Sequence, residues 1–148
     1  MCDQSVSWGI DLPATLAARI RSLAAESADG RETGGILLGN GPDADGIIRV
    51  RHVGAAGSNA QRRGDFFQRD LDYARSFAAA AFLTDGSEWI GEWHTHPVGG
   101  AQPSARDLQT YATILSTTLA FEVLLSLIVT PTPNGWSDAD LNVWLLST

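Results

Sequence analysis

The chain has 148 residues, about the usual size of one compact domain, and we expect residues 1–148 to form a single domain. Hydrophobic residues make up 44% of it and charged residues 18%, which excludes the disordered and fibrous classes and indicates an ordinary globular protein. The net charge of -7 argues against a nucleic-acid partner, because binding to a phosphate backbone depends on clustered Lys and Arg.

The first predicted element is a helix from about Leu12 to Ala28. Asp11 is placed to cap this helix, and Pro13 falls in its first turn, where a missing N–H is tolerated. The apolar positions that recur at helical spacing are Leu12, Leu16, Ile20 and Leu23.

Two short apolar strands, 33–40 and 46–53, follow that helix. The glycine-rich turn between them predicts a hairpin, and we interpret His52 at its end as structural. Residues 54–64 indicate a polar loop, in which we interpret Arg62 and Arg63 as solvated side chains rather than substrate contacts.

A second helix is predicted from Arg69 to Leu83, and a strand follows over 88–96 with two histidines at its end. Side chains alternate between the two faces of a strand. We therefore expect His94 and His96 to share one face with Glu92 and Ile90, whereas Trp93 points into the core on the other face.

The last third of the chain predicts a helix from Ser104 to about Leu119 and then strands at 121–130 and 139–147. The order of elements indicates the α/β class, with a mixed, partly antiparallel sheet flanked by three helices. No leader segment or long apolar run is present, so we expect a cytoplasmic protein without a membrane partner.

The stretch from His94 to Asp107 has the residue types of a metal site. Catalytic zinc typically takes three His or carboxylate ligands and leaves a fourth position for water. Cys2 is the only cysteine, so a cysteine cluster is excluded, and His94, His96 and Asp107 supply a possible set. Ser104 and Asp107 also form a capping-box pattern, so a purely structural Asp107 and a merely polar strand end remain alternatives.

These residues resemble the JAMM motif of the MPN/JAB metalloprotease family, in which His-Ser/Thr-His is followed by seven residues, Ser, two residues and Asp. His94 to His96, Ser104 and Asp107 match each spacing, and Glu32 precedes a glycine-rich apolar strand as the upstream glutamate of the family does. The phrase GEWHTHP most resembles small stand-alone deconjugases of bacterial anti-phage operons, such as CBASS and ubiquitin-like conjugation systems.

The resemblance implies an MPN/JAB-like domain with a curved sheet and a role for each matched residue. His94, His96 and Asp107 would bind Zn2+, which lowers the pKa of its water and polarises the scissile carbonyl. Glu32 would act as the general base, and Ser104 would donate a hydrogen bond to the developing oxyanion.

Three functions follow from the resemblance. The first is a zinc isopeptidase or peptidase that cleaves the amide after the C-terminus of a ubiquitin-like or otherwise conjugated protein, with E1-like and E2-like enzymes of the same operon as possible partners. The second is a processing peptidase for a sulfur-carrier protein of ubiquitin fold. The third is a non-catalytic MPN scaffold, although such members usually lose the ligands that are all present here.

Overall fold

The computed structural model describes residues 8–117 and 122–147. Its helices are α1 (Ala14–Glu26), α2 (Leu71–Asp85) and α3 (Ala105–Thr117). The strands of the larger sheet are β1 (Gly9–Asp11), β2 (Gly34–Asn40), β3 (Ile47–Val53), β6 (Glu88–Thr95), β7 (Val123–Thr132) and β8 (Gly135–Ser147), and a small hairpin comprises β4 (Gln61–Arg62) and β5 (Phe67–Gln68).

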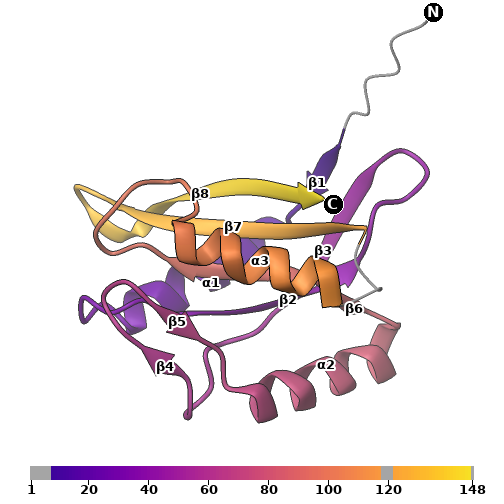
Figure 1. Ribbon diagram of the computed structural model, residues 1–148, viewed down its shortest axis with the longest axis horizontal. Coiled ribbons are helices and arrows are strands. Elements are labelled where there is room, and N and C mark those ends of the chain that lie inside the picture. Colours follow the sequence, from indigo (N-terminus) through magenta and orange to yellow (C-terminus); the bar gives the residue numbers. More distant parts are fainter. Residues whose placement is uncertain (1–7, 118–121, 148) are drawn as a thin grey trace, which may run out of the picture.

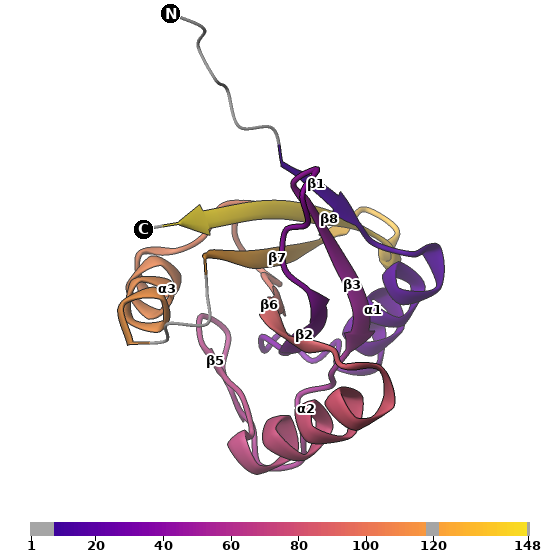
Figure 2. The same ribbon diagram turned by 90° about the vertical axis from the view of Figure 1, so that its right-hand side faces the viewer.

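The larger sheet is mixed and has the strand order β1-β3-β2-β6-β7-β8. β1 pairs parallel to β3 and β6 pairs parallel to β7, while the remaining neighbours are antiparallel. The sheet curls, with α1 against one face and with α2 and α3 against the other (Figures 1 and 2). The predicted class, an α/β fold with a mixed curved sheet and three helices, is confirmed.

The first helix is shorter than predicted at both ends. Asp11 does not cap it but ends β1, a three-residue strand that the sequence pattern missed. Pro13 occupies the N-cap position without a side-chain cap, and the helix stops at Glu26. A strand as short as β1 shows no period, because it is defined by its pairing with β3 far along the chain.

Other boundaries move by a few residues. Asp70 caps α2 by accepting a hydrogen bond from Tyr73 N, and Gly86 ends that helix with a φ of 76°. β8 begins before the predicted 139, because it continues the antiparallel ladder up to the turn after β7. Predicted helix residues 118–119 and strand residue 121 lie outside the described residues, as does Cys2.

A bulge in β6 changes the face on which one side chain lies. Leu37 pairs with Gly91 and Leu38 pairs with Trp89, so Ile90 is an extra residue between them. Ile90 packs in the same buried cluster as Trp93. The prediction that Ile90 shares the histidine face is therefore wrong, whereas the core position of Trp93 is confirmed.

A buried hydrogen bond ties α3 to the sheet. The hydroxyl groups of Tyr111 and Ser126 lie 2.7 Å apart, and the two residues are 2% and 0% exposed. Tyr111 is one helical turn beyond Asp107, so this contact also fixes the start of α3. No helix among the described residues has the length and apolar character needed to cross a bilayer.

We expect Tyr111→Phe to destabilise the fold by about 1–3 kcal/mol, because the buried Ser126 hydroxyl loses its partner. Ser126→Ala should have a similar effect, and the double variant should lose much less than the sum of the two. Urea unfolding of the three variants checks this prediction. Additive losses would show that the two hydroxyl groups contribute independently.

Candidate metal centre

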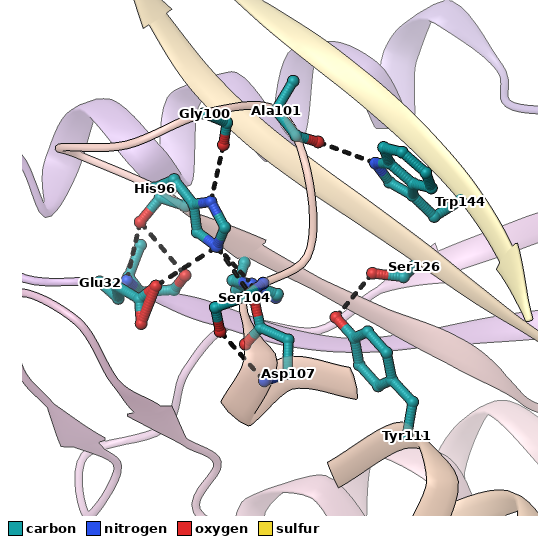
Figure 3. A network of polar contacts seen from close by, with 12 residues as sticks. Glu32, His96, Gly100, Ala101, Ser104, Asp107, Tyr111, Ser126 and Trp144 are labelled. Atoms are coloured by element: carbon teal, nitrogen blue, oxygen red, sulfur yellow. Dashed lines mark hydrogen bonds and ion pairs between the residues drawn. The ribbon is translucent and has the colours of Figure 1, made fainter. Parts of the chain in front are cut away.

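Three segments bring the predicted site residues together. Glu32 stands two residues before β2, His94 and His96 lie on and just beyond the end of β6, and Asp107 lies in the first turn of α3. β2 and β6 are antiparallel neighbours with Gly34 opposite His94, which places the residues before β2 beside the histidines. Figure 3 shows Glu32, His96 and Asp107 pointing toward one another.

The approach of β2 to β6 depends on glycine at position 34. A Cβ added to Gly34 would lie 2.2 Å from the Trp93 carbonyl oxygen and 2.9 Å from the His94 Cβ. Beyond the ladder, Thr33 N donates to Thr95 Oγ1 at 2.9 Å, and Thr95 N donates to Thr33 O at 2.8 Å. The glycine-rich entry thus lets the backbone next to Glu32 lie against the histidine strand.

The donor atoms converge on one point. His94 Nε2 and His96 Nε2 lie 3.0 Å apart, and each lies 3.2 Å from Asp107 Oδ2. Glu32 Oε1 is 3.6 Å from His96 Nε2. Ligand atoms of a tetrahedral zinc ion, with bonds of about 2.0–2.2 Å, are separated by about 3.3 Å, so the donor set fits such an ion.

When His96 is neutral, its contact with Asp107 lacks a proton. His96 Nδ1 lies 2.8 Å from Gly100 O, a carbonyl oxygen that only accepts, so this nitrogen carries the hydrogen. In the neutral ring, Nε2 then presents a lone pair to Asp107 Oδ2 and to His94 Nε2. Two lone pairs that face each other require either an added proton or a cation between them. In metal sites, a histidine is usually oriented by a hydrogen bond from the ring nitrogen that does not bind the metal, and Nδ1 of His96 makes such a bond here.

Burial and the close contacts among the site residues shift their pKa values. Burial favours the neutral form of Asp107, but hydrogen bonds with His94 and His96 outweigh it and hold the pKa of the carboxyl well below its usual range. Burial lowers the pKa of His96, yet contacts with Asp107 and Gly100 outweigh burial and leave that pKa raised. The pKa of Glu32, which is 4% exposed, is raised by burial against the pull of both histidines.

Asp107 is both a capping residue and a member of the cluster. Ser104 N donates to Asp107 Oδ2 at 2.8 Å, and Asp107 N donates to Ser104 Oγ at 3.0 Å. The capping box predicted as an alternative is therefore formed, and the same Oδ2 faces both imidazoles. The cap fixes the rotamer that aims the carboxylate at the histidines.

The loop between β6 and α3 is held from outside the motif. Trp144 on β8 donates from Nε1 to Ala101 O at 2.8 Å, next to Gly100, which orients His96 (Figure 3). No motif in the sequence gives Trp144 a role beyond packing. Nothing in its local sequence marks the contact, because β8 meets this loop only in the folded chain.

A groove adjoins the cluster and lies between α3 and the β4–β5 hairpin. The hairpin lies apart from the main sheet, beside the start of α3 (Figure 1). The groove has a volume of about 340 Å3, and its lining includes Phe66, Phe67, Glu92 and Thr110. The guanidinium of Arg106 lies 5.0 Å from the centre of the Phe66 ring, which ties the hairpin to α3. A smaller cavity of about 30 Å3 shares the same four lining residues and is also lined by His94 and Asp107, which connects the groove to the donor cluster.

Two residues outside the motif also gain clear partners. His52, interpreted as structural, pairs with Asp85 through Nε2 and Oδ2 at 2.8 Å. Arg62 is not a solvated side chain, and that prediction is wrong. Its side chain is only 16% exposed, and its Nε donates to the Glu32 carbonyl at 2.9 Å.

Comparison with known proteins gives a matching family model and a sequence relative. A family model described as prokaryotic homologs of the JAB domain matches residues 13–145. A CD-NTase/cGAS isopeptidase from Enterobacter hormaechei subsp. hoffmannii (strain UCI 50) is 30% identical over 83 residues. The match covers 56% of this chain and only 46% of that protein, so the chain matches less than half of the relative's length.

Two solution structures share the fold. A protein from Desulfitobacterium hafniense superposes with a TM-score of 0.66 and 20% identity, over 96% of this chain and 86% of that one. A protein from Salinibacter ruber (strain DSM 13855) superposes with a TM-score of 0.56 and 23% identity, over 96% and 88% of the two chains. At these identities the likeness concerns the fold alone.

Proposed function

This chain belongs to the family of prokaryotic JAB domains, and from that premise we propose that it is a zinc-dependent isopeptidase or peptidase. Its substrate in this proposal is the amide bond after the C-terminus of a ubiquitin-like or otherwise conjugated protein. The observation that carries the proposal is the convergence of Glu32, His94, His96 and Asp107 from three segments on one point.

His94, His96 and Asp107 would hold the zinc ion, because their three facing atoms lie 3.0–3.2 Å apart and the neutral His96 ring turns a lone pair toward the Asp107 carboxylate. A bound zinc ion would supply a water made acidic at neutral pH and a Lewis acid for the scissile carbonyl. The cap from Ser104 and the Gly100 carbonyl keep two of these ligands in place without any metal.

Glu32 would serve as the general base. Its carboxylate oxygen lies 3.6 Å from His96 Nε2, farther than the 3.0–3.2 Å that separates the other three atoms from one another. Burial raises the pKa of Glu32, which brings a carboxylate closer to the proton affinity that a base needs near neutral pH. In this role Glu32 takes a proton from the attacking water and passes it to the leaving amine.

Ser104 would donate to the oxyanion. Its Oγ accepts from Asp107 N, which leaves the hydroxyl hydrogen free to point into the site. We expect Ser104→Ala to lower kcat by about 10²-fold and to destabilise the protein by about 1 kcal/mol through loss of the cap.

The variant Ser104→Gly separates the two roles of this serine, because glycine replaces a capping serine at a cost of only a few tenths of a kcal/mol. It should keep most of the stability and still lose the same factor in kcat. Steady-state kinetics and thermal unfolding of both variants check this. Wild-type activity in Ser104→Gly would show that Ser104 only caps α3.

The groove beside the site suits an extended chain terminus. Phe66 and Phe67 line it on the hairpin side, and Thr110 lines it on α3. Ubiquitin-like proteins present flexible C-terminal tails, and the name of the Enterobacter relative refers to an isopeptidase of a CD-NTase or cGAS. We propose that conjugates of this type, formed by E1-like and E2-like enzymes, are the substrates.

A substrate trap tests the proposed function. Zinc-loaded Glu32→Gln protein, with the base removed and the ligands intact, is used to capture partners from cells of the source organism for mass spectrometry. Capture of a ubiquitin-like protein or its conjugates, which the wild type then cleaves in a chelator-sensitive manner, supports the proposal. Capture of sulfur-carrier proteins favours the processing peptidase, and partners that bind but are never cleaved contradict a hydrolase and indicate a scaffold.

A further inference from the structure

We propose that Arg62 is the positioning residue for Glu32, a role that rests on the proposed function of Glu32 as the general base. Through Arg62 the β4–β5 hairpin, which lines the groove, also holds the backbone that carries Glu32. Occupancy of the groove and placement of the base would therefore be mechanically linked.

Glu32 lies outside the main sheet, and the contacts between the two strands extend only as far as its neighbour Thr33, which pairs with Thr95. β2 begins at Gly34, and the paired register with β6 also begins there. The backbone of Glu32 is hydrogen-bonded to the hairpin at both of its polar groups: its N–H donates to Arg63 O at 2.6 Å, and its carbonyl accepts from Arg62 Nε at 2.9 Å. The backbone of the base is thus clamped on both sides by consecutive hairpin residues.

The rest of the Arg62 guanidinium fixes the loop that leads to Glu32. Nη2 donates to Ser27 O at 3.0 Å and to Asp29 Oδ1 at 2.9 Å, and Nη1 donates to Asp29 Oδ2 at 3.0 Å. Hydrogen bonds from Arg31 and Arg62 hold the pKa of Asp29 well below its usual range, so this carboxylate stays charged. The planar guanidinium group of Arg62 therefore connects the end of α1, the loop and Glu32.

The same hairpin reaches the groove a few residues later. Arg62 pairs with Phe67 in the hairpin ladder, and Phe67 lines the groove beside Phe66. The contact between Arg106 and Phe66 connects the hairpin tip to the helix that carries Asp107. A substrate tail in the groove would press on an element that is bonded directly to the backbone of the base.

Arg62→Ala and Arg63→Ala form a matched pair. Both remove one positive charge from adjacent hairpin positions, but Arg63 is exposed and its contact with Glu32 is made by its backbone. With ubiquitin carrying a fluorogenic C-terminal amide as the probe, we expect Arg62→Ala to lower kcat by about 10- to 100-fold. KM and zinc affinity should stay close to wild type, and Arg63→Ala should retain full kcat.

Hydrogen exchange of the metal-free proteins gives a second readout that needs no activity. We expect the Glu32 amide to exchange at least about tenfold faster in Arg62→Ala than in Arg63→Ala, with the β7 amides unchanged. Arg62→Lys keeps the positive charge but not the several donors of the guanidinium group. Its kcat and the exchange rate of its Glu32 amide should therefore lie between those of the wild type and Arg62→Ala. If Arg62→Ala fails to fold, this variant and Arg63→Ala carry the comparison.

Equal hydrogen-exchange rates of the Glu32 amide in the two alanine variants would overturn the proposal. So would a loss of activity in Arg62→Ala that comes entirely from a higher KM or a weaker zinc affinity. Failure of the wild-type protein to cleave the ubiquitin probe would count against the proposed function with that substrate. The exchange measurement would still decide whether Arg62 holds Glu32, so the two failures are distinguishable.

Discussion

Glu32→Gln is expected to lower kcat by about 10³-fold or more while the protein keeps its zinc. Glutamine has nearly the same shape as glutamate but cannot accept the proton of the attacking water at neutral pH. The three atoms assigned to the metal belong to His94, His96 and Asp107 and are untouched by the change. Steady-state kinetics together with elemental analysis of the purified variant measure both parts of the prediction.

The matched control for this change is Glu26→Gln, which removes the same charge from an exposed position at the end of α1. It should have wild-type kcat and zinc content. More than about a tenth of wild-type activity in Glu32→Gln would contradict the assignment of the base, because general acid–base catalysis typically contributes 10²–10⁴-fold. Loss of zinc from the variant would instead assign Glu32 to the ligands.

His96→Ala is expected to abolish cleavage and to remove the stabilisation of the protein by zinc. His96 Nε2 lies within 3.6 Å of donor atoms from Glu32, His94 and Asp107, so its removal opens the centre of the cluster. Zinc at about 100 times its Kd should stabilise the wild type by about 2.7 kcal/mol, a rise in Tm of about 5–10 °C. Neither the rise nor any cleavage should remain in the variant.

Chelation should reproduce this result in the wild type, and added zinc should reverse it. His52→Ala is the matched control, because His52 pairs with Asp85 away from the cluster and should keep the zinc-induced rise in Tm. Thermal unfolding with and without zinc, followed by a cleavage assay, compares the two variants. A rise in Tm that persists in His96→Ala would show that the metal binds elsewhere.

The parts of the site that were predictable are local in sequence. His94 and His96 are close together on one strand end, and Ser104 and Asp107 open the next helix, so spacing alone suggested a ligand set. Glu32 is predictable only through the family resemblance, because it lies 62 positions before His94 and no short pattern links the two residues. Their meeting depends on the pairing of β2 with β6.

What the sequence did not predict depends on contacts between distant segments. Ile90 changes face at a bulge that exists only in the paired strands, and β1 is defined by its partner β3. Arg62 looked like one of two loop arginines, and only the fold shows that its side chain turns inward to Glu32 while Arg63 stays exposed. Trp144 likewise gains its role from the loop it meets across the sheet.

The most direct test is a crystal structure of the zinc-loaded protein with anomalous data collected at the zinc edge. We expect one strong peak among His94 Nε2, His96 Nε2 and Asp107 Oδ2, with the Glu32 carboxylate beside it and not bonded to it. A peak at another place, or no peak in crystals grown with zinc, would contradict the account of this cluster as the catalytic metal centre.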